Sequence, residues 1–193
     1  MRDHDGRSGL FGAVGDSTER VIAASTHEAT TRDAAAFVAL VEPVLPAAYR
    51  LAVAMLRSQP DAEDAVQEAT SKAWRHFARF RAGAEMKPWL LAIVANECRR
   101  QRRARWWSVI RSGGELAFRP LAPAEPDARH ADLRRALYRL PQDQRLALVL
   151  RYYLDLSFEE VAQVMKTTTK AAKSRTYRAL DRLRLSPEIV AGE

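Results

Sequence analysis

The sequence contains a single cysteine, four scattered histidines and no long uninterrupted apolar run. Cys98 alone excludes an intramolecular disulfide, and the histidines at 4, 27, 76 and 130 do not have the spacing of zinc ligands. No segment approaches the roughly 18 consecutive apolar residues of a membrane span, and residues 2–24 lack the apolar core of a signal peptide. We therefore expect a cytoplasmic protein without direct membrane insertion.

Catalytic motifs are missing as well. The sequence has no Gly-rich phosphate loop, no metal-ligand spacing, and no serine or cysteine with an evident neighbouring base. Because no histidine lies near Cys98, this residue is interpreted as a small packing residue rather than a nucleophile. We expect a protein that is not an enzyme and that has no cofactor or metal.

Positive charge is in excess. The 31 Lys and Arg against 24 Asp and Glu give a formal net charge of +7, which suits nucleic acid or an anionic membrane surface. Five of the seven residues from 99 to 105 are arginines, whereas a short acidic segment precedes them at Asp61, Glu63, Asp64 and Glu68. This separation of charge indicates two different partners.

The first part of the chain predicts a flexible leader followed by a helical domain. Residues 1–32 show no sustained periodicity, whereas apolar residues recur at helical spacing from Ala34 to Leu56. Pro43 and Pro46 lie inside that stretch, so one bent helix or two short helices fit equally. Two further helices are predicted to complete a domain over residues 33–107.

The next helix of this domain is predicted to start at Ser58 and Pro60. Proline is favoured in the first turn of a helix, because the N–H that it lacks would have no partner there anyway. Its predicted apolar stripe is Ala62, Val66, Ala69, Ala73 and Phe77. The segment from 79 to 87 contains Gly83 and is predicted to be a loop. Pro88 then starts a third helix, whose predicted core residues are Leu90, Ile93 and Val94.

A second domain is predicted over residues 127–186, after a flexible linker at 108–126 and before a tail at 187–193. The linker contains two glycines and three prolines, which break any helical period. Pro141 separates two predicted helices, whose apolar positions are Leu133, Ala136, Leu137 and Leu140, and then Leu146, Val149, Leu150 and Tyr153.

A helix-turn-helix is predicted in this second domain. Ser157 and Glu160 form a capping box, in which each side chain accepts a hydrogen bond from the backbone N–H of the other residue. The helix that follows is predicted to bury Val161, Val164 and Met165. A turn at Lys166–Thr168 leads to a helix from about Thr169 to Arg184. The fold class is therefore all-α, with two small helical domains, a flexible linker and a C-terminal helix-turn-helix.

The last helix has a cationic, hydrogen-bonding face. Its members recur at three- and four-residue steps: Lys170, Lys173, Ser174, Tyr177, Arg178 and Asp181. Such a helix fits the major groove of DNA, where Lys and Arg meet guanine acceptors or phosphates. An ordinary solvated helix is the alternative.

The arginine-rich helix carries a second candidate nucleic-acid surface. Its Trp89, Asn96, Arg99 or Arg100, and Arg103 fall on one side, which suits unstacked bases and a phosphate backbone. A solvated helix end with Trp89 in the core is the simpler alternative. The acidic residues Asp61, Asp64 and Glu68 lie along one face of the preceding helix. The alternative to a binding surface is the preference of acidic residues for a helix N-terminus, and Glu68 is also spaced to pair with Lys72 one turn away.

Three segments together resemble sigma-70 family factors of the extracytoplasmic-function group. They are DAEDAVQEATSKAW at 61–74, PWLLAIVANECRRQRR at 88–103, and LPQDQRLALVLRYYLDLSFEEVAQVM with KSRTYRALDRLR at 140–184. The match covers residues 37–184 and includes the order and spacing of all three segments, which is far more specific than a lone helix-turn-helix.

The resemblance implies that the first domain binds the clamp helices of the largest subunit of core RNA polymerase through Asp64, Gln67 and Glu68. It implies that the 79–87 loop captures a flipped base of the minus-ten promoter element. The minus-ten residues would be Trp89, Asn96, Arg99, Arg100 and Arg103. The minus-thirty-five residues would be Arg151, Lys173, Ser174, Tyr177 and Arg178. The linker would thread through the core enzyme, and an anti-sigma protein is a further implied partner.

Two segments depart from the family pattern. Bulky apolar residues are usual where Thr70 and Ser71 stand, which predicts looser packing under the clamp-binding helix. A turn with Gly and Pro is usual at 166–170, so here another residue must adopt a positive φ or the turn must take another geometry.

We expect a sigma factor that directs promoter recognition and strand opening. Two rivals remain open: a stand-alone helix-turn-helix regulator that binds a palindromic site as a dimer, and a structural single-stranded nucleic-acid binding protein with little sequence preference.

Overall fold

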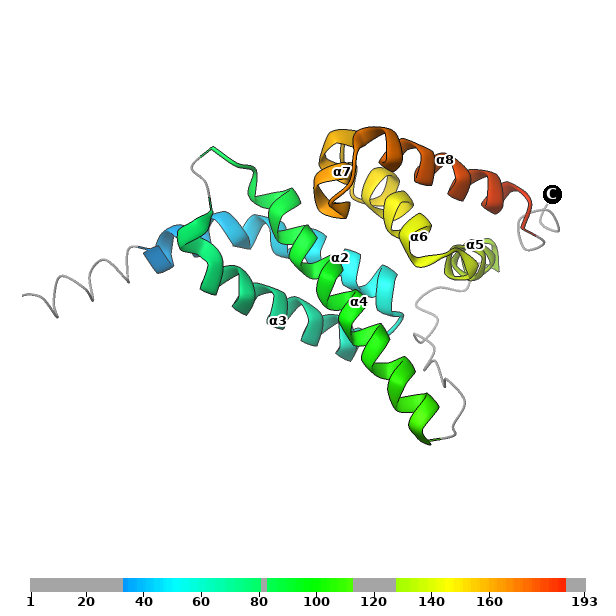
Figure 1. The fold of residues 1–193 in the computed structure, drawn as a ribbon, viewed down its shortest axis with the longest axis horizontal. Coiled ribbons are helices and arrows are strands. Elements are labelled where there is room, and N and C mark those ends of the chain that lie inside the picture. The colour runs from blue at the N-terminus through cyan, green and yellow to red at the C-terminus, as the bar shows by residue number, and fades with distance from the viewer. Residues whose placement is uncertain (1–32, 81–82, 113–127, 187–193) are drawn as a thin grey trace, which may run out of the picture. The chain divides into compact units, whose positions relative to one another are not determined.

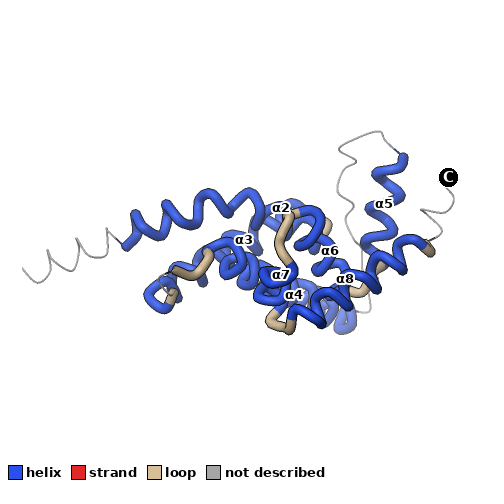
Figure 2. The backbone as a smooth tube through the Cα atoms, turned by 90° about the horizontal axis from the view of Figure 1, so that it is seen from above, coloured by secondary structure: helices blue, strands red, loops and turns tan. Residues whose placement is uncertain are grey.

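The computed structural model describes residues 33–80, 83–112 and 128–186, and every regular element in these ranges is helical (Figures 1 and 2). The chain divides into two compact units, Met1–Leu40 and Val41–Glu193. Residues 33–41 are helical. The later elements are η1 (Glu42–Val44), α2 (Leu45–Leu56), α3 (Gln59–His76), η2 (Phe77–Arg79), α4 (Met86–Ser112), α5 (Ala128–Arg139), α6 (Gln142–Leu148), the π-helical η3 (Val149–Tyr153), α7 (Phe158–Met165) and α8 (Thr169–Arg184).

The all-α fold class is confirmed. The predicted leader at 1–32, most of the predicted linker and the tail at 187–193 lie outside the described residues. The two prolines of the first apolar stretch have separate effects, since Pro43 lies in the 3-10 turn η1 and Pro46 in the first turn of α2. The stretch is therefore helical throughout with one tightened turn, and α2 ends at Leu56, after which the C-cap residue Arg57 has a φ of 62°.

The stretch Asp33–Leu56 is long and apolar enough to cross a membrane on length and composition alone. Its α2 portion, however, buries Ala48, Leu51, Ala52 and Met55, and α2 contacts both α3 and α4. Side chains that are already covered by other helices do not face lipid, so we interpret α2 as the core helix of a three-helix bundle.

Helix α3 packs through alanines. Ser58 caps it by accepting a hydrogen bond from the N–H of Asp61 at 3.4 Å, as predicted. Its buried residues are Ala62, Ala65, Ala69 and Ala73, and each has no exposed surface. The predicted core residues Val66 and Phe77 are only half-buried. Helix α3 therefore contributes only methyl groups to its buried face, and the larger buried side chains come from α2 and α4.

The two unusual residues of α3 do not enter the core. Thr70 is half-buried and its hydroxyl donates to the carbonyl oxygen of Val66 at 2.8 Å, while Ser71 is exposed. Neither hydroxyl is therefore buried without a hydrogen-bond partner, because that of Thr70 is bonded and Ser71 is exposed to solvent.

Helix α4 begins two residues before Pro88 and buries Leu90, Leu91, Val94, Ala95 and Cys98. The predicted core residue Ile93 is half-buried. The helix continues to Ser112, so residues 108–112, predicted to be part of the linker, are helical. Their sequence contains no glycine or proline, and the first breakers are Gly113 and Gly114.

In the C-terminal half, Leu140, Leu148 and Ala179 form a buried cluster that Leu137, Leu180 and Leu183 flank. Two predicted core residues are wrong: Leu133 is 41% exposed and Tyr153 is 56% exposed. Tyr153 lies in the π-helical turn η3, whose wider hydrogen bonding changes the angular position of its residues. The regular helical period assumed for Tyr153 therefore does not hold there.

Candidate nucleic-acid interface

The helix-turn-helix is positioned by two side-chain caps. The predicted capping box is present: Ser157 Oγ accepts from the Glu160 N–H at 3.1 Å, and a Glu160 carboxylate oxygen accepts from the Ser157 N–H at 2.6 Å. Thr168 caps α8 by accepting from the N–H of Ala171 at 3.2 Å. Both helices therefore start at residues that side-chain hydrogen bonds define.

The turn without glycine uses a lysine in the left-handed region. Lys166 has φ 51° and ψ 53°, and its N–H donates to the end of α7. The next N–H, of Thr167, donates to the carbonyl oxygen of Ala162 at 2.9 Å. A non-glycine residue in this conformation is strained, because its Cβ crowds the backbone. The expected positive φ is therefore at Lys166.

An aromatic ring at the start of α7 gathers three of the predicted minus-thirty-five residues. The Phe158 ring centroid lies 5.2 Å from the Arg151 guanidinium carbon and 5.5 Å from Lys173 Nζ. The centroids of Phe158 and Tyr177 are 6.2 Å apart. Cations over a ring face are attracted by its quadrupole. Phe158 was not predicted from the sequence as a site residue, although an aromatic residue directly after an N-cap was a usable signal.

The other predicted α8 residues pair with each other. Arg178 Nη2 donates to Ser174 Oγ at 2.8 Å, and the Arg178 side chain is exposed. Lys173 and Tyr177 are exposed as well, so the α8 face is cationic and hydrogen-bonding, as predicted.

Arg151 is held inside its own domain. Its Nη1 donates to the carbonyl oxygen of Leu156 at 3.0 Å and lies 3.6 Å from a carboxylate oxygen of Asp155. Asp155 itself has a φ of 53°. The guanidinium thus fixes the connection before α7 and is only partly exposed, so its role as a DNA contact stays a prediction.

A row of aromatic rings runs from α3 through η2 to the start of α4. Trp74 and Phe77 are stacked with centroids 6.3 Å apart, Phe77 and Phe80 are 6.1 Å apart, and Phe80 and Trp89 are 5.0 Å apart. Trp74 is 39% exposed. Aromatic faces are the usual stacking partners of unpaired bases. The sequence assigned only Trp89 to nucleic-acid binding, because the other three rings precede the arginine-rich helix.

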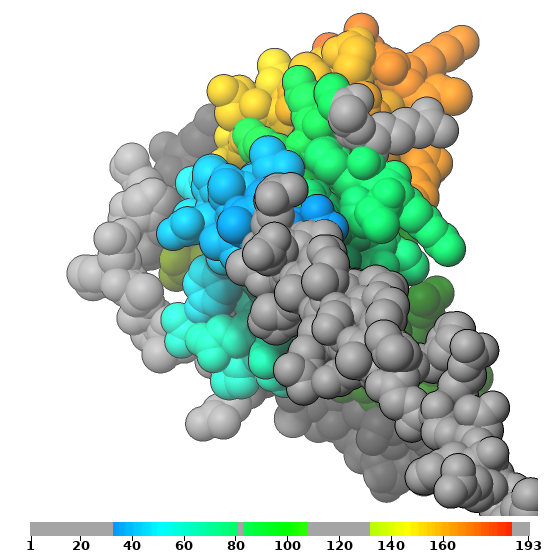
Figure 3. Space-filling model, turned by 90° about the vertical axis from the view of Figure 1, so that its left-hand side faces the viewer, coloured from blue at the N-terminus to red at the C-terminus, as the bar shows by residue number. Residues whose placement is uncertain are grey.

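The connection next to this row is described only in part, since residues 81 and 82 lie outside the described ranges. Gly83 has a φ of 86°, a backbone conformation that a glycine adopts without strain. Residues 83–85 are exposed, and the green surface at the start of α4 is visible in the space-filling view (Figure 3).

The arginine-rich part of α4 exposes three of its predicted residues, Asn96, Arg100 and Arg103. Arg99 is more enclosed: its Nη1 donates to Asn96 Oδ1 at 3.3 Å, and its Nη2 lies 3.6 Å from a carboxylate oxygen of Asp143. The sequence left Arg99 and Arg100 as equal candidates. The structure gives Arg100 the larger exposed fraction, 55% against 25% for the two side chains.

The acidic stripe of α3 separates into two parts. Asp61 forms an ion pair with Arg105, which connects α3 to α4. Asp64 and Gln67 are exposed. Glu68 lies 3.2 Å from Lys72 Nζ, which confirms the predicted pair, and 3.6 Å from Arg75.

Comparison with known proteins agrees with this arrangement. The Sigma-70 region 2 family model matches residues 40–108, and the Sigma-70 region 4 family model matches residues 130–183. The RNA polymerase sigma factor SigV of Bacillus subtilis is 31% identical over 142 residues, which cover 71% of this chain and 82% of SigV. The ECF RNA polymerase sigma factor SigM of Mycobacterium tuberculosis is 34% identical over 146 residues, which cover 70% of this chain and 68% of SigM.

A solved structure shares the fold. The sigma factor RpoE from Bartonella quintana, in complex with the anti-sigma factor NepR, matches with a TM-score of 0.63 and 32% identity, covering 75% of this chain and 91% of RpoE. Fold and surfaces thus define a helical DNA-binding transcription factor. The chain belongs to the sigma-70 family of RNA polymerase sigma factors, in the extracytoplasmic-function (ECF) group.

Proposed function

We propose that this sigma factor, which directs transcription initiation, divides its tasks among three surfaces. The α3 surface, Asp64, Gln67 and Glu68, binds the clamp helices of the largest core polymerase subunit. The minus-ten surface consists of Trp89, Asn96, Arg99, Arg100 and Arg103 on α4. The minus-thirty-five surface consists of Arg151 with Lys173, Ser174, Tyr177 and Arg178. The protein acts in the cytoplasm without catalysing a reaction.

The observation that carries this proposal is the charge separation between two packed helices. Helix α3 presents exposed Asp64 and Gln67, while α4 presents exposed Arg100 and Arg103. A cationic protein partner fits the first surface and a phosphate backbone fits the second. A stand-alone regulator that used α8 alone would have no use for either surface.

Strand opening follows from the row Trp74, Phe77, Phe80 and Trp89. The exposed ring of Trp74 is a stacking partner for an unpaired base, the other three rings support it in a row, and the neighbouring arginines hold the phosphates. Bases that open transiently are trapped, so the protein needs no chemical step to separate the strands.

An anti-sigma protein is the further partner that we propose. RpoE of Bartonella quintana was solved in complex with the anti-sigma factor NepR. Such a partner would compete with core polymerase or DNA for the surfaces defined above.

The test is transcription by sigma-free bacterial core polymerase on fragmented genomic DNA, with the purified full chain added and the transcript starts sequenced. New starts downstream of a shared pair of spaced motifs support the proposal. If no new starts arise although the chain binds duplex DNA specifically, the stand-alone regulator replaces it.

The division of tasks is tested with charge reversals. Arg103→Glu should abolish open-complex formation while core affinity is retained, and Asp64→Lys should reduce core affinity. The exposed Glu42→Lys, a charge reversal outside all three surfaces, is the matched control. The assignment is wrong if Arg103→Glu still melts the promoter.

A further inference from the structure

One acidic side chain between α3 and α4 is buried although it belongs to the most cationic helix. Glu97 is 5% exposed. Burial raises the pKa of its carboxyl, but hydrogen bonds from Lys72 and Arg100 outweigh burial and hold the pKa below its ordinary value. A buried charge is stable only when it is paired, so this carboxylate depends on its two cations.

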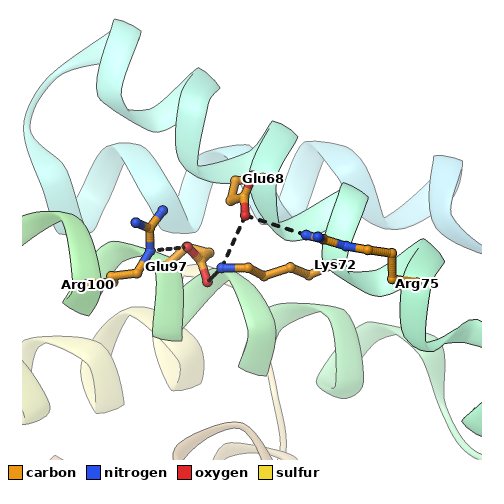
Figure 4. A network of polar contacts seen from close by, with 5 residues as sticks. All are labelled: Glu68, Lys72, Arg75, Glu97 and Arg100. Atoms are coloured by element: carbon orange, nitrogen blue, oxygen red, sulfur yellow. Dashed lines mark hydrogen bonds and ion pairs between the residues drawn. The ribbon is translucent and has the colours of Figure 1, made fainter.

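The two oxygens of Glu97 serve two different helices. Oε1 accepts from Lys72 Nζ of α3 at 2.6 Å, and Oε2 accepts from Arg100 Nε of α4 at 2.7 Å. Lys72 Nζ also lies 3.2 Å from Glu68 (Figure 4). A chain of alternating charges therefore runs from Arg75 through Glu68, Lys72 and Glu97 to Arg100. We define these five residues as the charge chain.

The charge chain joins two of the proposed surfaces. Glu68 belongs to the α3 surface and Arg100 to the minus-ten surface. Glu97 holds Arg100 by Nε alone, and Figure 4 shows the two terminal nitrogens of Arg100 pointing away from the carboxylate. A guanidinium fixed at Nε keeps its outer pair of N–H donors free to meet a phosphate in a bidentate arrangement.

We propose that Glu97 is a positioning residue that orients Arg100 for the DNA backbone and couples it to the core-binding Glu68 through Lys72. This inference rests on the proposed function of those two surfaces. When a cationic partner engages Glu68, that carboxylate neutralises Lys72 less, and Lys72 interacts more strongly with Glu97 across the 2.6 Å contact that already exists. Glu97 then neutralises Arg100 less, so core binding increases the attraction of Arg100 for a phosphate.

The experiment measures open-complex formation by reconstituted holoenzyme on a promoter taken from the transcript-start experiment. Glu97→Gln keeps the shape of the side chain but removes the charge that holds two cations. It should slow open-complex formation by about tenfold, the effect expected when a hydrogen bond between charged groups is lost. Glu97→Asp should restore part of the rate, and Glu42→Gln should match the wild type.

The decisive comparison places Glu97→Gln in the Arg100→Ala background. A residue that acts through Arg100 has no further effect once Arg100 is removed, whereas a residue that only stabilises the fold slows both backgrounds equally. Circular dichroism melts of each variant show whether it is folded at the assay temperature. Equal slowing in both backgrounds overturns the inference and leaves the minus-ten surface intact. If Arg100→Ala alone has no effect, the proposed function of Arg100 fails as well.

The coupling to the core surface has its own readout. In the wild type, Glu68→Gln should alter both core affinity and the salt dependence of promoter binding by holoenzyme. With Glu97→Gln present, Glu68→Gln should alter core affinity alone. A change in salt dependence that persists without Glu97 would overturn the coupling.

Discussion

Replacing the strained lysine of the helix-turn-helix should stabilise the protein. Lys166 has a φ of 51°, and its side chain is exposed. A non-glycine residue in the left-handed helical region costs about 1–2 kcal/mol, and the greater freedom of glycine in the unfolded chain offsets about 0.5–1 kcal/mol of the gain. Lys166→Gly should therefore raise the stability of the α6–α8 region by about 0.5–1 kcal/mol.

Hydrogen exchange is the suitable assay, because the four tryptophans all precede residue 108 and do not report on α7 and α8. A gain of about 1 kcal/mol slows global exchange about fivefold. The amides to follow are those of Val161–Met165 and Ala172–Ala179. The backbone caps of the turn remain, since they involve N–H and carbonyl groups alone.

Lys166→Ala is the matched control for this prediction. Alanine keeps the Cβ that causes the strain but removes the charge and the long side chain. It should leave exchange unchanged within about twofold. The reasoning is refuted if Lys166→Gly accelerates exchange in α7, or if Lys166→Ala slows exchange as much as glycine does.

Three other measurements test the chemistry of single side chains. Burial, and next the charge of Glu97, raise the pKa of Cys98 to about 12, so iodoacetamide at pH 8 should modify this thiol only in urea; modification of the folded protein would contradict its burial. The pKa of Glu97 is lower in the folded protein than in the unfolded chain, where it is about 4.3. The ionised side chain therefore stabilises the fold at a pH above about 4.3, and this stabilisation is lost as the pH falls through the pKa of the folded protein. The denaturation midpoint should thus drop in acid, and Glu97→Gln should flatten that drop; an identical pH profile for both would refute it. Phe158→Leu removes the ring beneath Arg151 and Lys173 and should weaken binding of holoenzyme to minus-thirty-five duplex by about fivefold, whereas Phe158→Tyr should not; equal binding by both variants would exclude a role for the ring.

Helix starts could be predicted because their signals are local. Ser58, Ser157 and the turn before Thr169 each combine an N-cap side chain with the backbone of the next three residues. The same holds for the pair of Glu68 and Lys72, which are one helical turn apart. Three- and four-residue steps also identified the cationic face of α8.

Contacts between elements could not be predicted in this way. The burial of Glu97 depends on Lys72, which is 25 residues away. The aromatic row combines rings from α3, η2 and α4, and the π-helical turn exposes Tyr153 against the assumed period. Arg151 was assigned to DNA from the family pattern, and its bond to the Leu156 carbonyl depends on a backbone connection that no periodicity describes.

The alanine stripe of α3 sets a limit on how this domain can change. Four fully enclosed methyl groups leave no room for a larger side chain, so a substitution such as Ala69→Leu must push α3 away from its neighbours. Glu68 and Lys72 would move outward with the helix, and the 2.6 Å contact with Glu97 would be lost. The four alanines therefore set the spacing between the helices that carry the two oppositely charged surfaces. Natural variation at these positions should be confined to alanine, glycine and serine.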